Sequence, residues 1–283
     1  MRSLSTMAQG NAPAVTVKSL CSQPAMAKRF SDVLGKRAPQ FLASVISTTN
    51  SSKALRECEP MSVMGSAMMA ATLDLPVVPA FGQAYIVPFR DHGVMKAQFQ
   101  IGYKGLIQLA QRSGQYSKMS MGEIYKDEYD GYDWVQDEVH YHEVEGGMRT
   151  THRNDPQYIA GFFAYFKMVS GFEKMVFWSM DEVKDHAKTY SESYRRGHGP
   201  WVDHFIEMAR KTVLKNTLSH WGVLSVAMQN AILSDQAVVE DVNGGETLEY
   251  PDNVEDEEEE QPQEAEQAPV TEAVADDAGA MTL

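Results

Sequence analysis

The sequence has little cysteine and no long apolar run. Only Cys21 and Cys58 are present, without a C-x-x-C pair, so neither a disulfide framework nor a thiolate metal site is expected. No uninterrupted apolar segment approaches the roughly 20 residues that a membrane helix needs. The first twenty residues also lack the compact apolar block of a signal peptide. We therefore expect a cytoplasmic protein without membrane attachment.

The sequence also lacks the motifs of common nucleotide and metal enzymes. There is no G-x-x-x-x-G-K-[ST] loop, which argues against an ATP-driven protein. Glu182-Val-Lys184 could belong to a metal nuclease, but Ser179 to Glu182 has the pattern of a helix capping box, a structural role. His140, His142 and His152 lie in alternating, strand-like sequence without a fourth ligand, so a zinc site is not expected. The sequence thus predicts no catalytic residue, no metal and no cofactor.

Basic residues are missing from the end of the chain. Asp235 to Leu283 holds 17 acidic residues and no Lys or Arg, within a chain whose net charge is −14. Removing these 17 from the 39 acidic residues leaves 22, against 25 basic residues, so positions 1–234 carry a net +3. Beyond Gly245 the composition becomes Glu, Asp, Ala, Gln and Pro, which cannot form a core. We expect a disordered acidic tail over 236–283 on a mildly basic body.

Helices are predicted for the first part of the body. Residues 1–22 are rich in Ser, Ala and small polar residues and are interpreted as a flexible arm. One helix has Pro24 in its first turn and Gly35 at its end, a second follows Pro39, and a third begins at Pro60. The third carries apolar residues at helical spacing, which predicts a buried face: Met61, Met64, Met68 and Ala71.

The pattern then changes to that of strands. Residues 84–89 predict a strand with Pro88 near its end, and residues 90–93 supply a turn. From Lys96 to Ile101 polar and apolar residues alternate, the pattern of a half-exposed strand. The two segments therefore predict a first hairpin.

The rest of the body mixes helices with short strands. A helix of about 103–113 ends at Gly114, and strands are predicted within 116–178. They include a hairpin around Ser170-Gly171, and two helices follow. The paired segments are 158–169 and 172–178, and the helices occupy roughly 180–190 and 201–221. The prediction is an α+β fold with N-terminal helices, an antiparallel sheet and C-terminal helices, in one core domain over 23–235.

Two of the predicted helices carry polar and basic faces. On the first, Lys104, Gln108, Gln111 and Arg112 share one face beside Tyr103. The amides at its start, after Gly102, suit a phosphate. A basic, amide-bearing stripe next to an aromatic ring can hold a nucleic-acid backbone while a base stacks. The same pattern also fits a merely solvated helix face.

The second such helix lies near the end of the body. His204, Lys211 and Lys215 fall on one stripe at helical spacing. Arg210 lies nearer the apolar side, so it is either paired in the core or placed at a buried phosphate. Position alone does not separate DNA contact from a solvated face.

Four blocks of this sequence resemble RecT-type annealing proteins. They run from Leu73 to Pro79, from Gly82 to Phe89, from Gln98 to Tyr116, and from Trp201 to Trp221 with its Met-Ala-Arg-Lys-Thr centre. The blocks occur in the family's order and cover roughly residues 25–230. Together they are specific, whereas any one of them is weak.

The resemblance implies a protein that is not an enzyme and that binds and anneals single-stranded DNA without ATP, for phage-type homologous recombination. It implies a bacterial host cell and an oligomer, either ring or helical filament. Further partners would be the annealed duplex, a phage exonuclease and a host single-strand-binding protein. The DNA path would follow a groove between the two polar helices. The implied DNA-binding residues are Tyr103, Lys104, Gln108, Arg112, Arg210, Lys211 and Lys215, with Tyr103 at a base and the cations at phosphates.

Three alternatives stay open from the sequence. One is a passive single-stranded DNA-binding protein, which protects DNA without accelerating pairing. Another is a nuclease or another DNA-processing enzyme. The third is a scaffolding protein whose charged faces meet other proteins.

Overall fold

The computed structural model of the chain describes residues 15–249, apart from His92, Trp134, Asp137, 236–237 and 243–244. Residues 1–14 of the predicted arm and 250–283 of the predicted tail lie outside the described residues. All described residues belong to one compact unit, Met1–Asn253.

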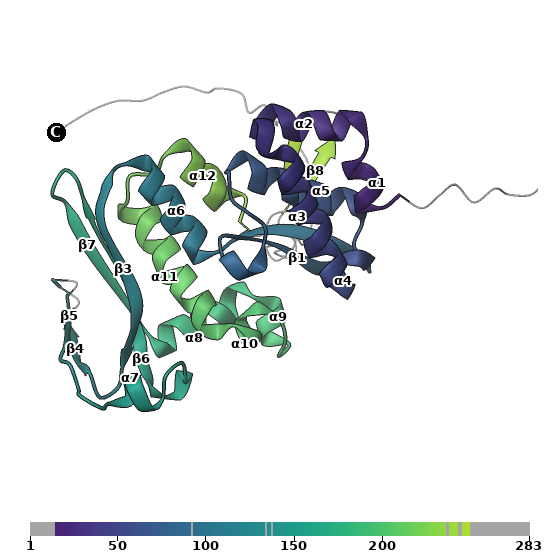
Figure 1. The fold of residues 1–283 in the computed structure, drawn as a ribbon. Helices are drawn as coiled ribbons and strands as arrows, with labels where there is room; N and C mark the ends of the chain where they lie inside the picture. Colours follow the sequence, from purple (N-terminus) through teal and green to yellow (C-terminus); the bar gives the residue numbers. More distant parts are fainter. Residues whose placement is uncertain are drawn as a thin grey trace, which may run out of the picture. The chain divides into compact units, whose positions relative to one another are not determined.

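Five helices open the described chain (Figure 1). Their bounds are α1 Val17–Cys21, α2 Pro24–Leu34, α3 Ala38–Ser51, α4 Lys53–Glu57 and α5 Pro60–Thr72. Proline occupies the first or second position of α2, α3 and α5, where its missing N–H costs nothing. Gly35 follows α2 with a φ of 57°, a conformation that favours glycine. The three predicted N-terminal helices are confirmed.

The helix α1 corrects the prediction of a flexible arm over 1–22. Thr16 and Ser19 form a capping box at its start, and Val17, Leu20 and Cys21 are buried in the main core. The small polar composition of the segment hides these three apolar side chains. The core domain therefore begins before residue 23.

The helix α5 lies at the centre of the N-terminal part. Met64, Met68 and Ala71 are buried, as the spacing predicts, whereas Met61 is exposed. This helix packs against α1, α2 and the hairpin β1 (Ala84–Asp91) and β2 (Val94–Ile101). The hairpin is antiparallel, with Ala84 opposite Ile101.

The prediction that β2 is half exposed is wrong, since Gln98 and Gln100 are both buried. The helix α5 runs along the strand: Ser62 Oγ accepts from Ala97 N (2.9 Å), and Ser66 Oγ donates to Ala97 O (3.1 Å). The strand β8 (Val238–Val242) also contacts both α5 and β2. The polar–apolar alternation of β2 gives no sign of either neighbour, α5 or β8.

The second half combines a sheet with helices. The helix α6 (Tyr103–Ser113) leads into a three-stranded antiparallel sheet in the order β3-β6-β7, formed by Tyr116–Tyr125, Ile159–Met168 and Glu173–Ser179. The strands β4 (Tyr129–Asp133) and β5 (Glu138–Tyr141) form a separate hairpin. The remaining helices are α7 Met148–Thr151, α8 Met180–Tyr190, α9 Glu192–Arg195, α10 Pro200–Asp203, α11 Phe205–Trp221 and α12 Val226–Leu233.

The two faces of this sheet have different neighbours. Phe162, Ala164 and Phe166 of β6 are fully buried, and α11 and α8 pack on that strand. In Figure 1 the helices α6 and α11 stand on one side of the sheet. On the other face, Tyr129 stacks on Phe177, and the Tyr132 ring lies tilted against the same side chain. The hairpin β4-β5 thus covers only part of that second face.

The mixed helical and antiparallel architecture confirms the α+β prediction. The segment predicted as the helix 201–221 is interrupted at His204, between α10 and α11. The strands β8 and β9 (Gly245–Glu249) form a hairpin within the range assigned to the tail. The ordered core thus continues past residue 235.

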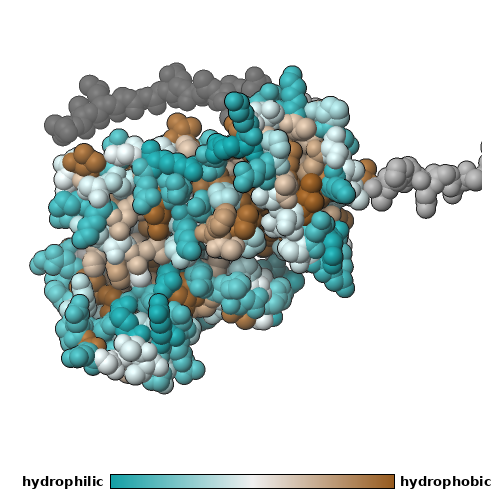
Figure 2. Space-filling model, in the orientation of Figure 1, coloured by the Kyte–Doolittle hydropathy of each residue, from teal (hydrophilic) through white to brown (hydrophobic). Residues whose placement is uncertain are grey.

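Two further features concern the hydropathy of the surface and of the helices. The face drawn in Figure 2 has hydrophobic residues in scattered groups between hydrophilic ones. Across the residues that the structure describes, none of the helices has both the length and the apolar character of a bilayer span.

Two glycines fix the start of α6 against the backbone before β1. Gly102 N donates to Gln83 O (2.9 Å), and a Cβ on Gly102 would lie 2.2 Å from Gly82 O. A Cβ on Gly105, one turn into the helix, would lie 2.2 Å from Gln83 O. Backbone meets backbone here, so no side chain can give way. The position of α6 therefore depends on these two residues.

We expect Gly105→Ala to lower the free energy of unfolding by about 1–3 kcal/mol, the usual cost of overpacking. Alanine favours helices over glycine, so helix propensity alone predicts the opposite sign. Thermal and urea unfolding measure the effect, with Gln111→Ala on the exposed side of α6 as the matched control. Equal or greater stability of Gly105→Ala would show that the close approach is not a constraint.

Candidate functional site

The helix α6 presents one polar face, as its spacing predicts. Lys104 and Arg112 are exposed and Gln108 is half-buried, while Leu106 and Leu109 are buried. Tyr103 is half-buried against the core, and Lys104 Nζ lies 6.0 Å from its ring centroid. Among the described residues Lys104 has no ion-pair partner. This face thus offers a cation and an amide at successive turns.

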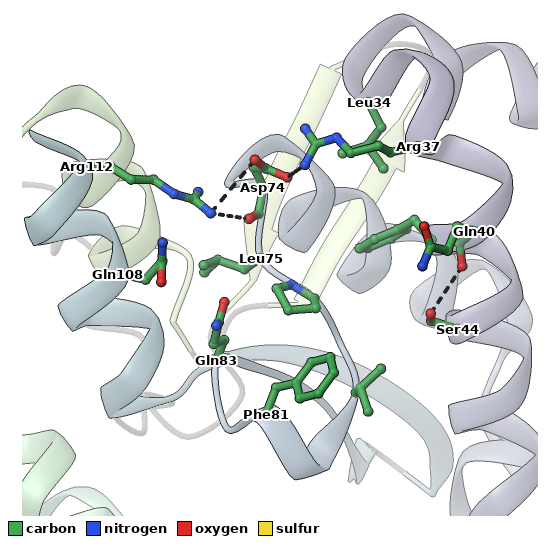
Figure 3. A pocket seen from close by; sticks show the side chains of 13 residues that line it. Leu34, Arg37, Gln40, Ser44, Asp74, Leu75, Phe81, Gln83, Gln108 and Arg112 are labelled. Atoms are coloured by element: carbon green, nitrogen blue, oxygen red, sulfur yellow. Dashed lines mark hydrogen bonds and ion pairs between the residues drawn. The ribbon is translucent and has the colours of Figure 1, made fainter.

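A pocket of about 490 Å³ lies between α6 and the N-terminal helices (Figure 3). Three glutamine side chains line it: Gln40 from α3, Gln83 before β1 and Gln108 from α6. Phe81, whose side chain is exposed, stands at its border, and Arg37 and Arg112 complete the polar wall. The pocket combines amide donors and acceptors with guanidinium groups and an aromatic ring.

Arg112 holds the loop that follows α5. Its guanidinium donates to Leu73 O (3.0 Å) and Asp74 O (2.9 Å), and it lies 3.8 Å from the Asp74 carboxylate. Asp74 has a φ of 52° and also binds Arg37 at 2.5 Å. Two arginines thus steady a backbone conformation that non-glycine residues seldom adopt. Arg112 keeps 38% of its side chain exposed.

A second cavity, of about 350 Å³, lies between α6, α11 and β3. Ile107 and Gln111 line it from α6, Leu214 from α11, and Tyr116 to Met121 from β3. This is the position of the groove that the sequence resemblance implies. None of the seven predicted DNA-binding residues lines it.

Arg210 takes the paired alternative that the sequence left open. Its guanidinium binds both oxygens of Glu123 on β3, at 2.7–3.0 Å. Arg149 donates to Glu123 O (2.8 Å) and to Glu128. Burial alone would raise the pKa of Glu128, but the hydrogen bonds from Arg149, the hydrogen bond from Tyr125 N and the charge of Arg149 together outweigh burial and lower that pKa. These pairs fasten α11 and the segment 147–151 to the sheet.

Lys211 and Lys215 both bind Asp235, at 2.8 and 2.9 Å. Asp235 also accepts from Ile101 N (3.1 Å), at the end of β2. The Asp235 side chain is 2% exposed and that of Lys211 7%, while Lys215 keeps 30%. Burial raises the pKa of Asp235, but the two ammonium groups outweigh this and lower it. Lys211 is therefore a core residue, not part of a solvated stripe.

The sequence missed Asp235 as a partner because this residue, the last of the predicted core, begins the run of acidic residues that ends the chain. Its link to Lys211 spans 24 positions, and no local pattern marks it. Glu123 was missed for the same reason, since it lies 87 positions before Arg210. In both cases the signal in the sequence was the basic residue itself, Arg210 or Lys211. A cation that is buried requires a carboxylate nearby.

The residues considered for metal or nuclease chemistry have other contacts. Ser179 and Glu182 form the predicted capping box, with Ser179 N donating to Glu182 Oε2 (2.7 Å). His142 Nδ1 lies 2.8 Å from Asp130. Within the described part of the chain, no three His, Cys, Asp or Glu side chains are grouped as a metal site.

Comparison with known proteins decides the family. The sequence model described as the RecT family matches residues 39–264, well over half of the chain. The chain belongs to the RecT family. Membership supports single-stranded DNA annealing in recombination, and single-stranded DNA binding is consistent with it.

Two relatives align with most of this chain. One is the protein YqaK of Bacillus subtilis (strain 168), 42% identical over 228 residues, which are 81% of this chain and 75% of YqaK. The other is Protein RecT of Escherichia coli (strain K12), 28% identical over 242 residues, which are 81% of this chain and 85% of the relative. The family match over residues 39–264 includes α6, α11 and Asp235.

In this RecT-family protein, we expect Asp235→Asn to lower the free energy of unfolding by about 3–5 kcal/mol, because it leaves a buried lysine without its counter-charge. Urea unfolding measures the loss, and Asp185→Asn, at an exposed carboxylate on α8, is the control. If Asp235→Asn unfolded at the wild-type urea concentration, the carboxylate would not be the connection between β2 and α11.

Proposed function

We propose that this protein anneals complementary single strands of DNA without ATP, acting as an oligomer, and that the DNA lies across the exposed face of α6. The observation that carries the proposal is the position of Lys104 and Gln108. An exposed cation without an ion-pair partner among the described residues stands one turn from an amide that lines a polar pocket. Family membership supports the substrate class.

The proposed contacts follow from charge and shape. Lys104 neutralises a phosphate, and the amides of Gln83 and Gln108 can donate to or accept from a base edge. The ring of Phe81 offers a stacking surface, which is sequence-tolerant because every base has a π-face. A pocket of about 490 Å³ has room for a base that has left the stack. The DNA strand would thus be held with some of its bases unstacked and available for pairing with a complementary strand.

The other predicted cations divide by their partners. Arg210 and Lys211 are engaged by Glu123 and Asp235, and we assign them the role of holding α11 in place. Lys215 and Arg112 are also paired, but each keeps about a third of its side chain exposed. We retain these two, with Tyr103, as flanking DNA contacts.

Annealing in this proposal requires no reactive group. The protein screens the phosphates and brings two strands together, and correct pairing supplies the free energy, about 1.4 kcal/mol per stacked step. Each subunit contributes few contacts, so an array of subunits is needed to hold a long strand. Oligomerisation is therefore part of the proposed mechanism.

We expect labelled complementary oligonucleotides to pair faster with the protein than without it, equally with ATP, with a non-hydrolysable analogue, or with EDTA. Binding without acceleration would favour a passive single-strand binder, and cleavage that EDTA abolishes would favour a nuclease. Absence of DNA binding would leave the scaffolding alternative. A strict requirement for ATP hydrolysis would exclude the proposed mechanism.

Lys104→Ala with Gln108→Ala should weaken single-strand binding about two- to tenfold, because an exposed charge contact is worth on the order of 1 kcal/mol. The plot of log affinity against log salt should become shallower by about 0.7 for one lost phosphate contact. Fluorescence anisotropy across a salt series measures both quantities. Lys53→Ala, at an exposed lysine of α4, is the matched control. A folded double variant with wild-type affinity and slope would move the DNA away from α6.

A further inference from the structure

The outer face of the β3-β6-β7 sheet, opposite α11, carries aromatic and basic side chains. Along β6 the buried residues Phe162, Ala164 and Phe166 face the helices. The intervening residues Phe163, Tyr165 and Lys167 therefore point to the other side, since successive side chains of a strand alternate. All three are half-buried. The central strand of the sheet thus presents two rings and a cation on its outer face.

The strand register brings more of the same kind of residue to this face. Lys118, Lys167 and Glu173 lie in one cross-strand row, and Ser120, Tyr165 and Met175 lie in the next. Lys118 and Ser120 are exposed. One row further on, Phe163 lies opposite Phe177, and the hairpin β4-β5 packs over that pair. Among the described residues, these two rows carry no covering element.

The Glu173 carboxylate contacts two of these side chains. The Tyr165 hydroxyl donates a hydrogen bond to the Glu173 carboxylate (2.6 Å), and Lys167 Nζ lies 3.3 Å from the same carboxylate. Lys118 Nζ lies 5.7 Å from the centroid of the Tyr165 ring. Two cations against one anion leave this face with a net positive charge. The Tyr165 ring is held between a lysine and a hydrogen bond, so its position is set before any ligand arrives.

We propose that this face is a second binding surface for single-stranded DNA, the sheet platform, formed by Tyr165, Lys118 and Lys167. The Tyr165 ring can stack on a base of an extended strand, since every base has a π-face. The lysines then meet the flanking phosphates. This inference rests on the proposed function, and it adds a site on the side of the sheet opposite α11.

The position of Lys118 links the platform to the α6 side of the molecule. This lysine also lines the cavity between α6, α11 and β3. The strand β3 is an edge of its sheet, so a DNA strand can pass around it from that cavity to the platform. One subunit would then hold a longer stretch of DNA than the α6 face alone can hold.

Charge favours DNA over a second copy of the chain as the occupant. A surface that buries against another copy is expected to be depleted in lysine at its centre. Here Lys118 lies over the Tyr165 ring, Lys167 lies beside Glu173, and Glu173 is the one carboxylate of these two rows. An anion that offers flat rings satisfies both features. Single-stranded DNA has that chemistry.

The test compares two opposite changes at the platform. Tyr165→Ala should lower single-strand affinity at least fivefold, since it removes a stacking surface. Glu173→Gln keeps an acceptor for Tyr165 but removes the negative charge, so it should raise affinity about twofold or more at low salt and steepen the salt dependence. Anisotropy with an unlabelled-competitor control measures both. Tyr141→Ala, at an exposed tyrosine of β5, should leave affinity unchanged.

The outcomes separate this inference from the proposed function. If Lys104→Ala with Gln108→Ala weakens binding while Tyr165→Ala and Glu173→Gln have no effect, the platform is overturned and the α6 site stands. If the platform variants change affinity and the α6 variant does not, the α6 path is wrong and the platform stands. If Tyr165→Ala instead changes the sedimentation of DNA-free protein, the face is an interface between copies. Should Tyr165→Ala fail to fold, the Glu173→Gln result decides alone.

Discussion

The buried carboxylate of Asp235 connects the parts of this fold that position the candidate site. It binds Lys211 and Lys215 of α11 and accepts from Ile101 N, the last residue of β2. The helix α6 begins two residues later, where Gly102 N donates to Gln83 O. The first turn of α6 is therefore fixed from one side by Asp235 and from the other by the backbone before β1. The polar face of α6 takes its direction from these two contacts.

This arrangement explains why the basic residues of the chain have different roles. A lysine removed from water needs a counter-charge, so Lys211 and Asp235 stabilise the core only as a pair. Arg210 and Glu123 form a similar ion pair, with Glu123 on the sheet. Lys104 differs, because it stays in water and has no ion-pair partner among the described residues, so an incoming phosphate displaces no protein partner. Burial and pairing, and not position on a helix wheel, separate the structural cations from the proposed DNA contact.

The local part of this structure follows from the sequence. Gly102 and Gly114 mark the two ends of α6, and Ser179 with Glu182 marks the start of α8, so both helices have their predicted bounds. The turn at Ser170-Gly171 likewise predicts the β6-β7 hairpin, because turn residues act over a few positions.

The rest depends on contacts between distant segments. The polar–apolar alternation predicts that Gln98 is exposed, yet it is buried, because α5 and β8 pack against its strand. Glu123 and Asp235 find their partners across the fold, and α1 is held by three apolar residues in an otherwise polar stretch. Of the candidate site, the α6 face could be predicted, whereas the glutamine-lined pocket and the sheet platform could not.

The most direct test of this account is amine labelling of the lysines, with and without a saturating single-stranded oligonucleotide, read by mass spectrometry. We expect DNA to slow the labelling of Lys104 and to leave that of Lys53 unchanged. Lys211 should label slowly in both states, because it is buried against Asp235. The account would be contradicted if Lys104 labelled at the same rate with and without bound DNA, or if Lys211 labelled as fast as Lys53 in the free protein.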